Sequence, residues 1–138
     1  MSVSIERRIY GPSSTPEEVA AIKARLTKVG KITFLWEEMP VQSPFSVQTM
    51  LEELHQRSES MSEFHLIVDL RSADPPPQDV RTALYKGLNS LTKMRKCACF
   101  TGRNFLLTAA VKFVLAAVRI PMPAYRTIEE ALLAVGEA

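Results

Sequence analysis

The segment FHLIVDL, residues 64–70, is the feature that most constrains the fold of this chain. Its side chains are apolar almost without interruption, which is typical of a strand buried on both faces of a sheet. The chain then passes through RSAD to three prolines, residues 75–77, which lock φ and favour a stiff, extended path into the next helix. A strand of this kind must be covered on both sides, so the segment predicts a layered domain.

Strand patterns and amphipathic helix patterns alternate along the chain. Strands are expected at residues 3–9, 31–37, 64–70, 97–101 and within 120–126, and helices at 16–29, 46–57, 80–96, 105–118 and 127–138. In the second half, strand and helix alternate three times, which is typical of parallel strands joined by right-handed crossovers. We therefore predict an α/β layered domain with a four- or five-stranded mixed sheet, parallel central strands and flanking helices.

The N-terminal region carries clear helix signals. Thr15 is placed as N-cap, Pro16 takes the first helical position, Glu18 completes a capping box and Gly30 supplies the stop. At 138 residues the chain has the size of one domain. We expect a single domain over residues 1–138, in which an N-terminal strand and helix (1–30) precede a core.

Composition narrows the function classes. The chain is 46% hydrophobic and 23% charged with a net charge of +2, which is typical of a soluble globular protein and gives no basic stripe for nucleic acid. No signal peptide is recognised and the apolar run 105–118 contains Lys112 and is too short to span a membrane, so a cytoplasmic location is expected. Cys97 and Cys99 have neither disulfide-framework nor zinc spacing, and neither a metal nor a cofactor is predicted.

Three predicted strands are each followed by an arginine: Arg71, Arg103 and Arg126. If these strands are parallel, the three guanidinium groups rise at the edge where α/β sheets usually bind ligands. Helix N-termini that attract anions are expected there at Asn104 and Thr127, with Gly102 allowing close backbone approach. The alternative is a solvated rim that pairs with nearby carboxylates.

The loop after residue 70 is the other candidate surface. Asp69, Ser72, Asp74 and Pro75 belong to it, and stiff proline segments offer contact sites of low entropic cost. A rigid connector between strand and helix is the competing interpretation. Catalysis by Asp69 as a base lacks support, because no nucleophile or second base can be placed beside it, so no enzyme activity is predicted.

The order of elements and several residues resemble one family. The strand ending LIVDLR, the strand CACFTG, the short strand AYR and the last helix TIEEALLAV are similar to the STAS, or SpoIIAA-like, domain of anti-sigma-factor antagonists, over roughly residues 31–138. The resemblance implies a small cytoplasmic bacterial domain that binds a partner protein, in many members under control of a phosphorylated serine. In this chain PPQD, residues 76–79, stands where that serine motif is expected, and Ser72 comes too early.

We therefore expect a non-enzymatic regulatory or protein-interaction module that uses residues 71–77, 102–105 and 126–127. The alternative is a small-ligand-binding protein that recognises a phosphate, a nucleotide or an anionic lipid headgroup at the same edge. Relatives without the serine include stand-alone proteins suspected of contacting membranes or small ligands, so peripheral membrane contact remains open for this chain. A homodimer is left open too.

Overall fold

The structure is a computed structural model that describes residues 7–103, 109, 111–112 and 122–137. The predicted helix at 105–118 lies outside the described residues apart from positions 109, 111 and 112, which are helical. Most of the strand predicted at residues 3–9 also lies outside them, and its described part, residues 7–9, is not a strand.

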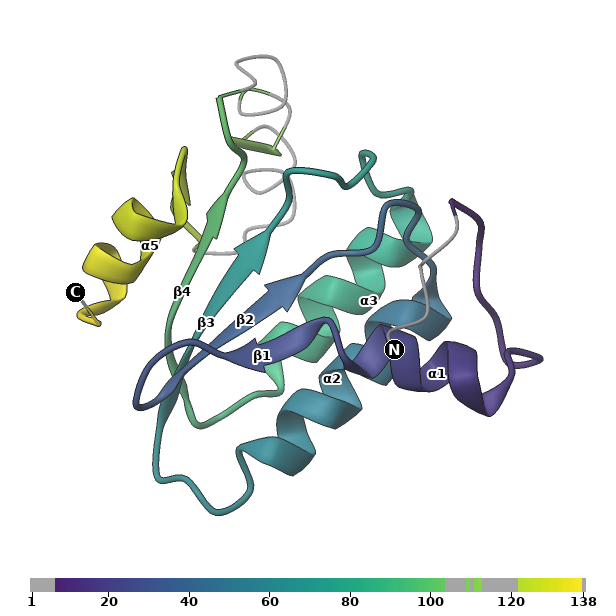
Figure 1. The fold of residues 1–138 in the computed structure, drawn as a ribbon, viewed down its shortest axis with the longest axis horizontal. Helices are drawn as coiled ribbons and strands as arrows, with labels where there is room; N and C mark the ends of the chain where they lie inside the picture. Colours follow the sequence, from purple (N-terminus) through teal and green to yellow (C-terminus); the bar gives the residue numbers. More distant parts are fainter. Residues whose placement is uncertain (1–6, 104–108, 110, 113–121, 138) are drawn as a thin grey trace.

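A five-stranded mixed sheet forms the centre of the domain (Figure 1), with the strands in the order β1-β2-β3-β4-β5. The strands are β1 Leu26–Lys28, β2 Thr33–Glu37, β3 Phe64–Asp69, β4 Met94–Phe100 and β5 Ala124–Tyr125. Strand β1 is antiparallel to β2, and all other neighbours are parallel. This confirms the predicted mixed sheet with parallel central strands, and it places the apolar β3 at the middle of the sheet.

Four described helices cover the two faces of the sheet (Figure 1). They are α1 Pro16–Lys23, α2 Pro44–Arg57, α3 Gln78–Asn89 and α5 Ile128–Val135. Side chains alternate across each strand, so Trp36 and Leu66 pack with the first three helices whereas Leu35 and Ile67 pack with α5. The core is therefore two apolar layers separated by the sheet.

Local capping explains where two helices begin. The Thr15 hydroxyl accepts a hydrogen bond from the Glu18 amide at 3.2 Å, and the Glu18 carboxylate accepts one from the Thr15 amide at 2.9 Å, as predicted. Ser43 and Ser46 exchange the same pair of bonds at 3.0 Å each, so α2 begins at Pro44 and not at residue 46.

Two predicted helices were too long, for one shared reason. Helix α1 ends at Lys23, and Leu26 pairs instead with Trp36 as part of the antiparallel edge strand. Helix α3 ends at Asn89, and Met94, predicted in that helix, pairs with Phe64 and begins β4. In both places strand pairing with a distant segment overrides the local helical periodicity.

Within the described parts of the chain, no helix is long and apolar enough to cross a membrane.

Candidate functional site

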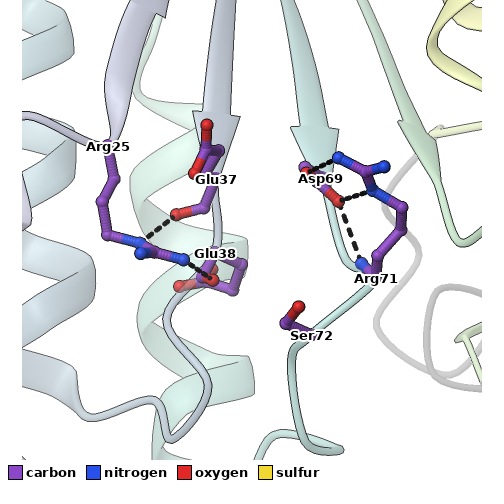
Figure 2. Close-up of a pocket in the computed structure, with 6 residues that line it drawn as sticks. All are labelled: Arg25, Glu37, Glu38, Asp69, Arg71 and Ser72. Carbon is purple, nitrogen blue, oxygen red and sulfur yellow. Dashed lines mark hydrogen bonds and ion pairs between the residues drawn. The ribbon is translucent and has the colours of Figure 1, made fainter. Parts of the chain in front are cut away.

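The carboxyl edge of the sheet, defined as the edge where β2 to β5 end, contains a polar pocket (Figure 2). Its volume is about 280 Å³, and its lining residues are Arg25, Glu37, Glu38, Asp69, Arg71 and Ser72. The sheet topology assembles it: β2 and β3 are parallel and end side by side, and the antiparallel β1 begins at the same edge, just after Arg25. In Figure 2, Arg25 with the two glutamates and Asp69 with Arg71 form two groups across the pocket.

Arg71 is held by Asp69 at the end of β3. Its backbone amide, Nε and Nη2 donate to the Asp69 carboxylate at 3.0, 3.1 and 2.9 Å. These hydrogen bonds, more than the charge of Asp69 itself, raise the pKa of the guanidinium. The Arg71 guanidinium carbon lies 5.0 Å from the centre of the Phe100 ring, and its side chain runs beside Gly102, which has a φ of +74°. Arg71 is thus fixed in place and paired.

Arg25 is engaged by backbone atoms on the opposite side of the pocket. Its Nε donates to the carbonyl oxygen of Glu37 and its Nη2 to that of Glu38, both at 2.9 Å. These two bonds hold the turn that follows β2. Both arginines that line the pocket therefore donate hydrogen bonds to other groups of the protein.

Glu38 is a buried carboxyl group at the pocket. The residue is only 3% exposed, and its Oε1 accepts a hydrogen bond from the Met39 amide at 2.8 Å. Burial raises the pKa of Glu38 from 4.5 to about 7, although the Met39 amide, Trp36 and Arg25 act in the opposite direction. The Trp36 indole influences this carboxyl without reaching hydrogen-bond geometry, so its buried Nε1 has no hydrogen-bond partner in the described structure. A carboxyl with a pKa near 7 changes its charge around neutral pH.

Three of the residues predicted from sequence, Asp69, Arg71 and Ser72, meet in this pocket. Asp74 lies further along the loop, where its amide donates to the Pro40 carbonyl at 2.9 Å and its carboxylate pairs with Arg7 at 2.5 Å. Pro75 is exposed beside it.

The other predicted residues follow β4 and β5. The Thr101 amide donates to the Tyr125 carbonyl at 3.0 Å, so the loops that carry Arg103 and Arg126 begin next to each other. Both arginines are exposed, and neither forms an ion pair with any residue that the structure describes. The Thr127 hydroxyl accepts from the Glu130 amide at 3.2 Å and so caps α5. Asn104 lies outside the described residues.

The structure gives the three predicted arginines different surroundings. All three are exposed, but Arg71 pairs with Asp69 and passes Gly102, whereas Arg103 and Arg126 have no ion-pair partner among the described residues. The carboxyl edge consequently has an acidic half at β2 and β3 and a basic half at β4 and β5.

Sequence reasoning missed Arg25, Glu37 and Glu38. The two glutamates directly follow the apolar strand residues TFLW, and consecutive carboxylates at a strand end were a usable signal. Arg25 had no such signal, because the predicted helix 16–29 placed it within a helix and away from the sheet edge.

The cysteines and histidines add no further site. Cys97 and Cys99 are unpaired strand residues, and burial raises the pKa of both thiols, that of Cys99 to about 12. Such thiols stay protonated at neutral pH and are poor nucleophiles. No group of three or more His, Cys, Asp or Glu residues in the described ranges is arranged to hold a metal ion.

Comparison with known proteins adds no assignment: no family model matches this chain, and no curated protein matches it.

Proposed function

We propose that the protein is a non-enzymatic regulatory module that binds a partner protein through the docking loop, residues 71–77, at the carboxyl edge of the sheet. One observation carries this proposal: the docking loop is exposed but braced by two neighbouring segments. A surface that is already fixed loses little conformational entropy when a partner binds. The resemblance to STAS domains, which act by binding proteins, supports the same function.

The bracing involves two separate parts of the chain, the segment between β2 and α2 and the helix α3. The Asp74 amide donates to the Pro40 carbonyl at 2.9 Å, and the Gln42 side chain donates to the Asp74 carbonyl at 3.0 Å. Arg81 of α3 donates to the Pro76 carbonyl at 3.1 Å. The prolines restrict the backbone between these anchors. The loop therefore presents exposed groups on a backbone that is held from both sides.

The chemistry of the described residues supports a binding role over a catalytic one. The Ser72 hydroxyl lines the pocket but makes no hydrogen bond with a carboxylate of the described residues, so it has no base to activate it. The thiols of Cys97 and Cys99 are held protonated by burial. Neither type of nucleophile is prepared for reaction.

Site-specific photocrosslinking tests the docking proposal. A photoreactive amino acid replaces Ser72 on the docking loop or, as a control, the exposed Thr82 on α3, in cells that make the protein natively. We expect one defined protein to be crosslinked from position 72 and not from position 82, and replacement of Pro75 and Pro76 by glycine to weaken that crosslink with little change in melting temperature. Equal crosslinking from both positions would contradict the proposal.

A second candidate function is favoured by the exposed Arg103 and Arg126. Two guanidinium groups without carboxylate partners among the described residues can bind a phosphate-bearing small ligand. Under this alternative Arg103→Ala weakens binding of inorganic phosphate in calorimetry by about tenfold, the scale of one lost charge-assisted hydrogen bond. Arg71→Ala has a smaller effect, because Asp69 already neutralises that guanidinium. An unchanged dissociation constant in Arg103→Ala excludes this candidate.

A further inference from the structure

We propose that the pocket between the ends of β2 and β3 binds a small organic monocation with a primary ammonium group. Arg71 and Ser72 of the docking loop also line this pocket, but the proposal does not depend on a protein partner. It differs from the alternative drawn from the sequence, which was an anionic small ligand.

The first argument is the free acceptors of the two glutamates. Arg25 and Arg71 each direct two of their five N–H donors to backbone carbonyls or to Asp69, so part of the donor capacity of the pocket is already used. The Glu37 carboxylate, in contrast, makes no hydrogen bond with a described residue, and the Glu38 carboxyl receives one, from Met39. These free carboxylate oxygens favour a ligand that supplies donors.

The second argument is charge. Three carboxyl groups and two guanidinium groups line the pocket, which leaves one net negative charge when all five are ionised. A single positive charge on the ligand balances it. A pocket of about 280 Å³ lies at the small end of the range for small-molecule sites, which suits a small ligand.

The third argument is the buried carboxyl itself. Glu38 is 3% exposed and has no counterion in hydrogen-bond contact, and the Trp36 Nε1 beside it is unpartnered among the described residues. Burial of an ionised carboxyl without a counterion is costly, so a bound cation stabilises the ionised form that burial disfavours. An ammonium group has three donors, which match the acceptors of Glu37, Glu38 and Ser72.

Binding should therefore depend on pH. The charged groups around Glu38 are Arg25 before β1, Glu37 at the end of β2, and Asp69 and Arg71 at the end of β3. Burial raises the pKa of Glu38 to about 7, so the carboxyl is mostly protonated at pH 6 and mostly ionised at pH 8. Since the cation prefers the ionised form, affinity should be about tenfold higher at pH 8 than at pH 6.

The test is a titration of the full chain with n-butylammonium chloride, monitored by calorimetry and by the fluorescence of Trp36, which is the only tryptophan. We expect saturable binding at pH 8, with no binding of butanol or butyrate at the same concentrations. Glu38→Gln should weaken binding about tenfold and remove its pH dependence, and Glu37→Gln should weaken it while the pH dependence stays. Glu59→Gln, an exposed carboxyl away from the pocket, is the matched control.

Three outcomes would overturn the proposal. Equal binding of butanol would show that the pocket recognises the alkyl chain. Unchanged affinity in both Glu37→Gln and Glu38→Gln would place the amine elsewhere. Binding of Nα-acetyl-lysine amide at least tenfold tighter than n-butylammonium would assign the pocket to a lysine side chain of a partner instead of a free amine. None of these outcomes affects the crosslinking test, so the two proposals fail separately.

Discussion

At the scale of single residues, Glu38 makes the strongest prediction about stability. In the folded protein its carboxyl keeps its proton up to about pH 7, whereas in the unfolded chain it loses the proton near 4.5. Between these pH values the folded state binds more protons, so this residue lowers the free energy of unfolding as the pH rises. The loss amounts to about 3 kcal/mol and is complete above pH 7.

Glu38→Gln removes this contribution because an amide does not titrate in the range and can still accept from the Met39 amide. Between pH 5 and pH 8, the free energy of unfolding measured in urea should fall by about 3 kcal/mol less in the variant than in the native protein. Glu59→Gln serves as the exposed control and should leave the pH profile unchanged. If the free energy of unfolding depends on pH in the same way in the native protein and in Glu38→Gln, then ionisation of Glu38 does not destabilise the folded protein.

Gly30 is required by a contact with the far end of the chain. A methyl group on Gly30 would lie 2.5 Å from the carboxyl carbon of Glu137, whose Oε1 accepts from the Ile32 amide at 3.0 Å and the Thr33 hydroxyl at 2.9 Å. Gly30→Ala must displace the Glu137 carboxylate from these two hydrogen bonds and should lower stability more than a glycine-to-alanine change without such a contact. Gly11→Ala, where nothing lies within 4 Å of the added methyl group, is the control and should change stability by less than about 0.5 kcal/mol. Equal effects of the two substitutions would refute the role of Glu137.

At the scale of elements, most strands and helices follow from the sequence, but two boundaries do not. The stripe Val19, Ile22, Leu26 and Val29 fits a helix, and Leu26 is indeed buried. Leu26 is buried as a strand residue paired with Trp36, however, and not as part of a helix. Val29, the last residue of the predicted stripe, is exposed. Periodicity reports that a residue faces the core; it does not report which distant segment pairs with it.

The contact between α2 and α3 gives a prediction that opposes helix propensity. Gly87→Ala in an isolated helix is stabilising by about 1 kcal/mol. In this protein the added methyl group would overlap Leu51 Cδ1, so we expect a net loss of about 1 to 2 kcal/mol in the free energy of unfolding. Thr82→Ala on the exposed side of α3 is the control and should be slightly stabilising.

Combining Gly87→Ala with Leu51→Ala separates overlap from other causes. Leu51→Ala alone leaves a cavity and should cost about 2 to 4 kcal/mol. The alanine methyl group at position 87 then enters that space, so the double variant should be more stable than the sum of the two single effects predicts. Simple additivity would mean that the two side chains do not compete for the same space.

At the scale of the whole molecule, the candidate site illustrates what sequence could and could not provide. Asp69 and Arg71 are close in the chain, and the end of an apolar strand indicated both as candidates; the structure places them together in the pocket. Arg25 reaches the same pocket through the antiparallel return of β1, which no local pattern indicated, whereas Glu38 directly follows β2. The pocket lies at the edge that the sequence indicated, but its three carboxyl groups come together only through the parallel pairing of β2 and β3.

The same topology makes a prediction about rigidity. Because the Asp74 backbone bonds to the segment after β2, the docking loop should be protected from hydrogen exchange although it lacks regular structure. Gln42 is 5% exposed and donates to the Asp74 carbonyl, so Gln42→Ala should cost about 1 kcal/mol locally and speed exchange of the Asp74 amide about fivefold. The Leu70 amide, which donates to Phe100 within the sheet, should be unaffected.

Gln48→Ala is the matched control, because Gln48 lies on the exposed side of α2 and bonds only to Glu52 among the described residues. Exchange at Asp74 should be the same in this variant as in the native protein. If the Asp74 amide exchanges at the rate of an unstructured chain in the native protein, the docking loop is not braced. The crosslinking result would then have to be explained by a loop that orders only on binding, with the larger entropic cost that such binding carries.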